Sequence, residues 1–238
     1  METANRQQQT AARLAGFLYL LTNAIAIFAF VVRGRLIVRG DAAQTAVNIL
    51  GSQQWFRAAI VAELLCVAGT VALVAALYVT LRPVNRNMAL LAVCWRLMEN
   101  ATLAVVTLAE FAMLALLGSD ATLHAVSQPE LQALSYAALR VYSAGFNIGF
   151  LFLGLGSVLF SYLWLRSGYV PRVIAAWGIF ASAMMALSMP VIMIFPDLNT
   201  RLMPFYLAPM GIYEIGFGLW LLVKGIDPHA RWRPEHAA

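Results

Sequence analysis

Charged residues are scarce in this chain. Asp, Glu, Lys and Arg make up 11% of its 238 residues, whereas soluble domains carry roughly 25%. Hydrophobic residues make up 62%, and the mean hydropathy is +0.77. This balance excludes an ordinary soluble domain and is typical of an integral membrane protein. At ~20 apolar residues per span, the length suits one bundle of about six or seven spans and leaves no room for a separate soluble domain.

Cysteine and histidine are also scarce. The two cysteines, Cys66 and Cys94, lie within apolar runs and form no CxxC motif, which argues against a disulfide framework or a redox motif. The three histidines lie outside the apolar runs, and the chain has no HExxH motif and no Ser-His-Asp order. We therefore expect no metal site and no cofactor, and the sequence identifies no catalytic residue.

Basic residues exceed acidic ones, which gives a formal net charge of +5. They lie in short connections, without a basic stripe and interleaved aromatic residues, so nucleic acid is not an expected partner. The expected partner is the lipid bilayer, whose anionic headgroups attract such residues.

Long apolar runs predict an all-α membrane bundle, and residues 1–238 form a single membrane domain. A short helix at 42–50, capped by Asp41, should lie at the membrane surface after the first span. The first apolar stretch is about 19 residues, longer than the ~7–15 of a signal peptide, so we expect it to remain as a span. Residues 226–238 read as a polar tail. The six predicted spans are residues 14–32, 54–81, 88–117, 130–165, 173–195 and 202–223.

The distribution of Lys and Arg predicts the orientation. Both termini should be cytoplasmic, because that arrangement places nine basic residues inside and four outside. The outer set is Arg33, Arg35, Arg39 and Arg201. The inner set is Arg6, Arg13, Arg82, Arg86, Arg166, Arg172, Lys224, Arg231 and Arg233.

Five ionisable residues interrupt the predicted spans. A charge at the bilayer centre costs on the order of 3 kcal/mol, so these side chains should face the protein interior or a wet cavity. Counting ~1.5 Å per residue from the turns predicts an inner cluster and an outer one. Arg96 and Glu99 are three residues apart and should pair. The five are Glu63, Arg96, Glu99, Glu110 and Glu214.

The predicted inner cluster is Arg96, Glu99, Asn100 and Glu214, at a depth of roughly 12–17 Å from the inner helix ends. The predicted outer cluster starts with Glu63 and Asn147, at roughly 27–29 Å. Glu110, Arg57 and Arg140 lie further out, and the two arginines can extend to the headgroups. The pattern Gly145-x-x-x-Gly149 predicts close helix packing within the bundle.

Short motifs surround the two tight polar turns of the chain. The motifs are Tyr78, Leu81-Arg82-Pro83-Val84-Asn85-Arg86, Ala89-Leu90-Leu91-Ala92, Arg96-Leu97-Met98-Glu99, Gly40-Asp41-Ala42-Ala43, Gly145-Phe146-Asn147-Ile148-Gly149, Phe152-Leu153-Gly154 and Arg166-Ser167-Gly168-Tyr169-Val170-Pro171-Arg172. With them the chain resembles the bacterial domain-of-unknown-function family numbered four-three-eight-six. The resemblance implies a multi-pass bacterial membrane protein of unestablished role, and it carries no substrate or catalytic residue with it. We expect the protein in the bacterial cytoplasmic (inner) membrane.

Three kinds of function fit these observations. The first is binding or transport of a small molecule, lipid or ion in a polar cavity lined by the residues of the two clusters. The second is a membrane-embedded enzyme in which Glu99 with Glu214, or Glu63 alone, acts as general acid or base. The third is a structural or regulatory subunit, in which the buried charges only hold the helices together.

Overall fold

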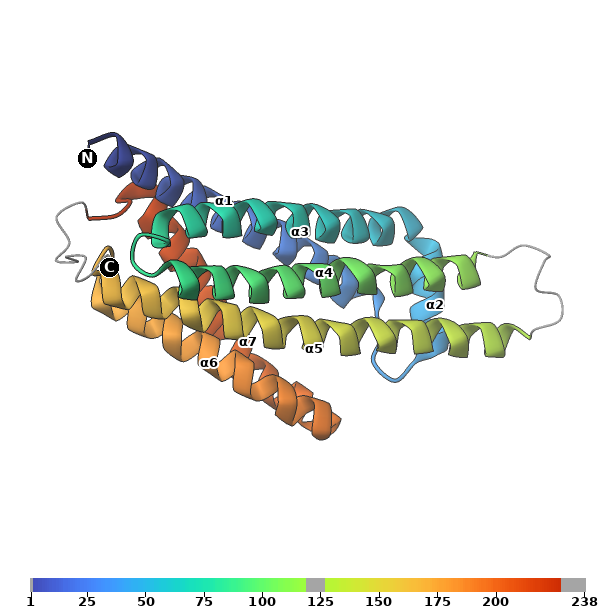
Figure 1. Cartoon of the computed structure of the whole chain (residues 1–238). Coiled ribbons are helices and arrows are strands. Elements are labelled where there is room, and N and C mark those ends of the chain that lie inside the picture. The colour runs from blue at the N-terminus through green and yellow to red at the C-terminus, as the bar shows by residue number, and fades with distance from the viewer. Residues whose placement is uncertain (1, 119–126, 228–238) are drawn as a thin grey trace.

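The structure is a computed structural model, and it describes residues 2–118 and 127–227. Within these residues every regular element is a helix (Figure 1). Six of the helices are long and apolar enough to cross a membrane, which confirms the predicted all-α architecture. The elements are α1 Glu2–Leu36, α2 Ala42–Gly51, α3 Gln53–Leu81, α4 Arg86–Leu117, α5 Gln128–Ser167, α6 Arg172–Ile194, the 3₁₀ helix η1 Pro196–Leu198, and α7 Asn199–Val223.

Capping residues fix several of the helix ends. The Asp41 carboxylate accepts a hydrogen bond from the backbone N–H of Gln44 and starts α2, where the sequence predicts a helix. Asn85 starts α4 in the same way, and such a cap is worth about 1 kcal/mol. Gly168 ends α5 with φ +68°, a left-handed conformation that glycine adopts at little cost. These caps produce the short turns that hold consecutive helices antiparallel.

The six long helices form a closed ring. Each of them packs against two neighbours, in the order α1, α3, α4, α5, α6, α7 and back to α1. The short α2 lies across one end of the bundle, against α5 (Figure 1). The start of α1 and the end of α7 meet at the opposite end, where the Gln9 side chain accepts a hydrogen bond from the backbone N–H of Ile226. We use "outer" for the α2 end and "inner" for the opposite end.

Helix α4 shows how polarity is distributed across the ring. Its charged side chains Arg96, Glu99 and Glu110 are at most 5% exposed. The apolar side chains Val105 and Leu108 on its other face are 62% and 64% exposed. A soluble helix has the opposite arrangement, whereas a membrane helix turns apolar side chains to lipid and hides its charges. The exterior of the ring therefore matches a lipid environment.

From α3 onward, the ends of the long helices agree with the predicted spans to within three residues. Helix α1 begins twelve residues before residue 14 and continues to Leu36, so the prediction that Arg33 lies in an outer loop is wrong. The predicted polar tail begins too early, because Ile226 is buried and the N–H of Asp227 donates to the Tyr169 carbonyl. The rest of that tail, residues 228–238, lies outside the described residues.

Candidate functional site

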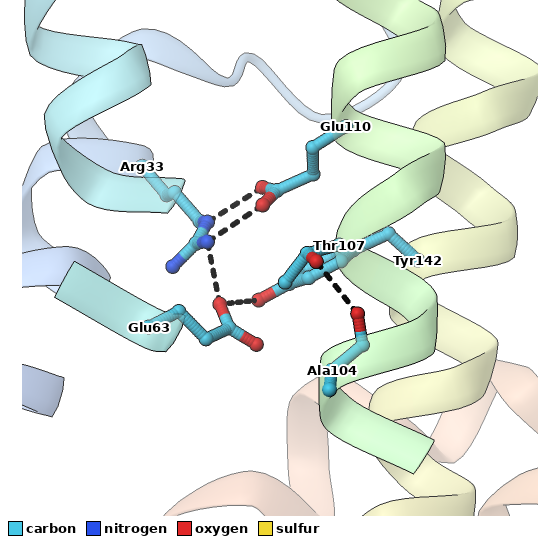
Figure 2. Close-up of polar contacts among 6 residues, drawn as sticks. All are labelled: Arg33, Glu63, Ala104, Thr107, Glu110 and Tyr142. Atoms are coloured by element: carbon cyan, nitrogen blue, oxygen red, sulfur yellow. Dashed lines mark hydrogen bonds and ion pairs between the residues drawn. The ribbon is translucent and has the colours of Figure 1, made fainter. Parts of the chain in front are cut away.

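Four side chains from four helices meet near the outer end of the ring. We call Arg33 of α1, Glu63 of α3, Glu110 of α4 and Tyr142 of α5 the outer site (Figure 2). All four are buried, and Glu110 has no exposed surface. The apolar side chains of Phe56, Ile60, Met113 and Leu139 pack in the same region and exclude water from it.

The Arg33 guanidinium lies at the centre of the outer site (Figure 2). Its Nε and Nη2 donate to Oε1 and Oε2 of Glu110, at 2.6 and 2.7 Å. Nη2 also lies 2.5 Å from Oε2 of Glu63. The Tyr142 hydroxyl donates to that same Glu63 oxygen at 2.6 Å, and the Tyr142 ring centroid lies 5.0 Å from the Arg33 guanidinium carbon. One arginine thus links two carboxylates from different helices and ties α1, α3, α4 and α5 together.

A second polar group lies deeper in the ring, toward its inner end. We call Asn23 of α1, Arg96 and Glu99 of α4, and Glu214 of α7 the inner site. Arg96 Nη1 lies 2.8 Å from Glu99 Oε2, which confirms the predicted pair. Asn23 donates to Glu214 Oε2 at 3.1 Å. Asn100, also predicted here, is buried but donates to the backbone carbonyl of Arg96 on its own helix.

The inner pair is poorly satisfied. Arg96 and Glu99 are 4% and 5% exposed, and among the described residues neither Arg96 Nη1 nor Glu99 Oε2 has a partner in hydrogen-bond geometry. Glu214 is partly buried and lies close enough for its charge to act on Glu99. An arginine and two carboxylates therefore share a space that supplies few hydrogen bonds.

Glycine at position 156 makes room for the inner site. A Cβ at Gly156 would lie 2.8 Å from Cγ and 3.0 Å from Cδ of Arg96. The aliphatic part of Arg96 therefore crosses α5 where α5 has no side chain. The predicted close packing at Gly145 and Gly149 is also confirmed, since a Cβ at Gly149 would lie 2.9 Å from Leu103 of α4.

Polar groups continue between the two sites. Cys66 of α3 is partly buried, and its thiol contacts the Thr22 carbonyl oxygen at 3.5 Å. Charges from both sites, Glu63 on one side and Glu99 and Glu214 on the other, act on this thiol. The Cys66 thiol therefore lies between the two sites.

The remaining predicted site residues lie elsewhere. Arg57 and Arg140 are exposed, so the prediction that Arg140 helps line a buried polar cluster is wrong. Asn147 is partly buried, and no hydrogen bond joins its side chain to another described residue. Arg57, Arg140 and Asn147 have the expected depth, but they lie on other faces of their helices.

Three residues of the two sites were not predicted as site residues: Arg33, Asn23 and Tyr142. Asn23 offers the clearest signal, because it is an amide inside the first apolar run. Tyr142 gives none, because aromatic residues are ordinary at membrane interfaces. The three histidines lie outside the described residues. Within residues 2–118 and 127–227, no group of three His, Cys, Asp or Glu side chains is placed to hold a metal ion.

The fold and the two sites define a multi-pass helical membrane protein with ionisable groups inside its ring. The family model described as "Domain of unknown function (DUF4386)" matches residues 14–225, and the chain belongs to this family. The match confirms the resemblance drawn from the motifs and extends it to nearly the whole chain. Neither the curated proteins nor the solved structures contain a match to the chain.

Proposed function

We propose that this protein binds a small polar molecule or ion at the inner site and acts as a transport-like protein. The observation that carries the proposal is the buried, incompletely hydrogen-bonded pair of Arg96 and Glu99. Arg96 Nη1 and Glu99 Oε2 lie 2.8 Å apart as an ion pair, but neither atom makes a hydrogen bond of good geometry. An unmade hydrogen bond at a buried group costs about 1–3 kcal/mol, and more when the group is charged. A ligand that bonds to both groups recovers this free energy, whereas a purely structural pair gains nothing from remaining unsatisfied.

The charges of the inner site favour a particular ligand chemistry. Glu99 and Glu214 supply two carboxylates against the single guanidinium of Arg96. With both carboxyl groups ionised, negative charges exceed positive ones, and a ligand with a positive charge or several hydrogen-bond donors complements the site. Intramembrane ionisable residues commonly mark solute and ion pathways, and the buried charges of the inner site support this reading.

The location belongs to the same proposal. We place the protein in a bacterial cytoplasmic membrane with both termini in the cytoplasm. The basic residues of the connections support this orientation. Arg33 is neutralised by buried carboxylates and does not act as a loop charge, which leaves Arg35, Arg39 and Arg201 on the outer side.

A ligand screen with matched variants tests the proposal. Wild type, Glu99→Gln, Glu214→Gln and the control Glu130→Gln are placed in lipid nanodiscs and heated with amino acids, polyamines, quaternary amines and simple salts. Glu130 is exposed at the start of α5. We expect at least one cationic or donor-rich compound to raise the melting temperature of the wild type and the control, but of neither inner-site variant.

The same variants separate the alternatives. Flux of the identified compound into proteoliposomes, lost in Glu99→Gln, supports transport. Chemical conversion of a bound compound by the wild type alone would replace the proposal with the enzyme hypothesis. If no compound stabilises any form and both variants only melt earlier, the inner site is structural and the proposal fails.

A further inference from the structure

We propose that the outer site binds one exchangeable proton, held on Oε1 of Glu63. This proposal concerns a site separate from the inner one and stands whether or not the inner site binds a solute. The outer site contains two carboxyl groups and one guanidinium, so one carboxyl has no cation of its own. The geometry shows which carboxyl that is.

Glu110 is the carboxylate that Arg33 neutralises. Both of its oxygens accept hydrogen bonds from the guanidinium, at 2.6 and 2.7 Å. Such a two-point pairing is the strongest arrangement that arginine forms with a carboxylate. Glu110 is completely buried, and its oxygens are already satisfied as acceptors, which leaves it no reason to take up a proton.

Glu63 is the surplus carboxyl. Its Oε2 shares the Nη2 group of Arg33 and accepts the hydrogen bond from Tyr142. Its Oε1 is buried and, among the described residues, has no hydrogen-bond partner. In Figure 2 no dashed line reaches this second oxygen.

The neighbours of Glu63 do not supply a second positive charge. The charged and titratable groups that face it are Arg33 on α1, Glu110 on α4 and Tyr142 on α5, with Cys66 one turn along on α3 itself. With every carboxyl ionised, the outer site has a net charge of −1 in an interior where uncompensated charge is costly. A proton from water that forms an O–H bond at Oε1 makes the site neutral, and Oε2 then remains the carbonyl oxygen.

A proton matches the available ligands better than a metal ion does. Hard cations take about six oxygen ligands. The unpartnered atom here is a single carboxyl oxygen, and the described residues around it include no third carboxylate. One unpartnered oxygen is enough for a proton.

Infrared spectroscopy of the protein in lipid tests this proposal, because a protonated carboxyl has a carbonyl stretch that a carboxylate lacks. We expect a protonated-carboxyl band at neutral pH that disappears in alkali and is absent from Glu63→Gln. Glu110→Gln should also remove the band at neutral pH, because Arg33 can then neutralise Glu63. Tyr142→Phe should keep the band but move it to higher wavenumber, since the hydrogen bond to Oε2 is lost.

Tyr162→Phe is the matched control, because Tyr162 is an exposed tyrosine of the same helix. It should leave the band unchanged. If Glu63→Gln does not fold, the shift in Tyr142→Phe and the loss in Glu110→Gln still assign the band. A spectrum without a protonated-carboxyl band at neutral pH overturns the proposal, and so does a band that ignores both Tyr142→Phe and Glu110→Gln.

Discussion

Replacement of Arg33 by methionine tests how much the outer site contributes to stability. Methionine keeps a long flexible side chain but removes the guanidinium that contacts Glu110 and Glu63. Loss of one partner from a buried ion pair costs about 3–5 kcal/mol. The loss of unfolding free energy has an upper limit, because Glu110 can take up a proton once Arg33 is gone. Protonating a glutamate of ordinary acidity at pH 7 costs about 4 kcal/mol. We therefore expect a loss of about 3–4 kcal/mol of unfolding free energy at pH 7.

The effect of Arg33→Met should depend on pH in a definite direction. Without the guanidinium, the folded variant binds a proton on Glu110 that the unfolded chain releases at neutral pH. Its stability must then fall as the pH rises. At pH 5 the protonation cost is only about 1 kcal/mol, so most of the loss should disappear there.

The assay is unfolding by sodium dodecyl sulfate in lipid bicelles. Arg35→Met is the matched control, because Arg35 is exposed in the same last turn of α1. The double variant Arg33→Met, Glu110→Met should regain at least half of the loss, because no uncompensated Glu110 remains. Two results would show that the outer site contributes no such stability: Arg33→Met costs no more unfolding free energy than Arg35→Met, or the double variant is no more stable than the single one.

Three further predictions follow from the packing and the caps. Gly16→Ala should lower the unfolding free energy by about 1–3 kcal/mol, because the new Cβ would lie 2.7 Å from a carbonyl oxygen of α7. Gly216→Ala should not lower it in the same assay, because no atom lies within 4 Å of the new Cβ. Gly156→Ala should displace the inner-site arginine and lower the affinity for any ligand found in the screen at least several-fold, whereas Gly216→Ala should not. Asp41→Ala should speed amide hydrogen exchange in α2 roughly five-fold, equivalent to the loss of about 1 kcal/mol of capping, and Asp41→Asn should not.

The six spans could be predicted because each apolar run is close to the thickness of a bilayer and ends in a polar turn. The depth of each charged residue along its helix could be predicted for the same reason. Arg96 and Glu99 pair as expected, and Glu63 and Glu110 both belong to the outer site.

Rotation about the helix axes could not be predicted. Asn147 and Arg140 have a suitable depth, but they lie on other faces of α5 than Tyr142. A helix hydrophobic on most sides gives no strong stripe to show which face turns inward. The inward face of α5 carries Tyr142, whose hydroxyl donates to Glu63 of α3.

Arg33 escaped prediction for a related reason. An arginine followed by Gly34 and a second arginine at the end of an apolar run predicts an interface and a loop. Helix α1 instead continues to Leu36, because carboxylates from α3 and α4 neutralise Arg33. These contacts join residues far apart in the sequence, so no local pattern encodes them.

The inner site is proposed to bind a small polar ligand. Native mass spectrometry of the gently purified protein tests this proposal most directly, with wild type, Glu99→Gln and Glu130→Gln compared side by side. We expect a discrete bound species on the wild type and on Glu130→Gln that is absent from Glu99→Gln. A wild type that carries no bound species, together with a Glu99→Gln variant that is merely less stable, would contradict the proposal.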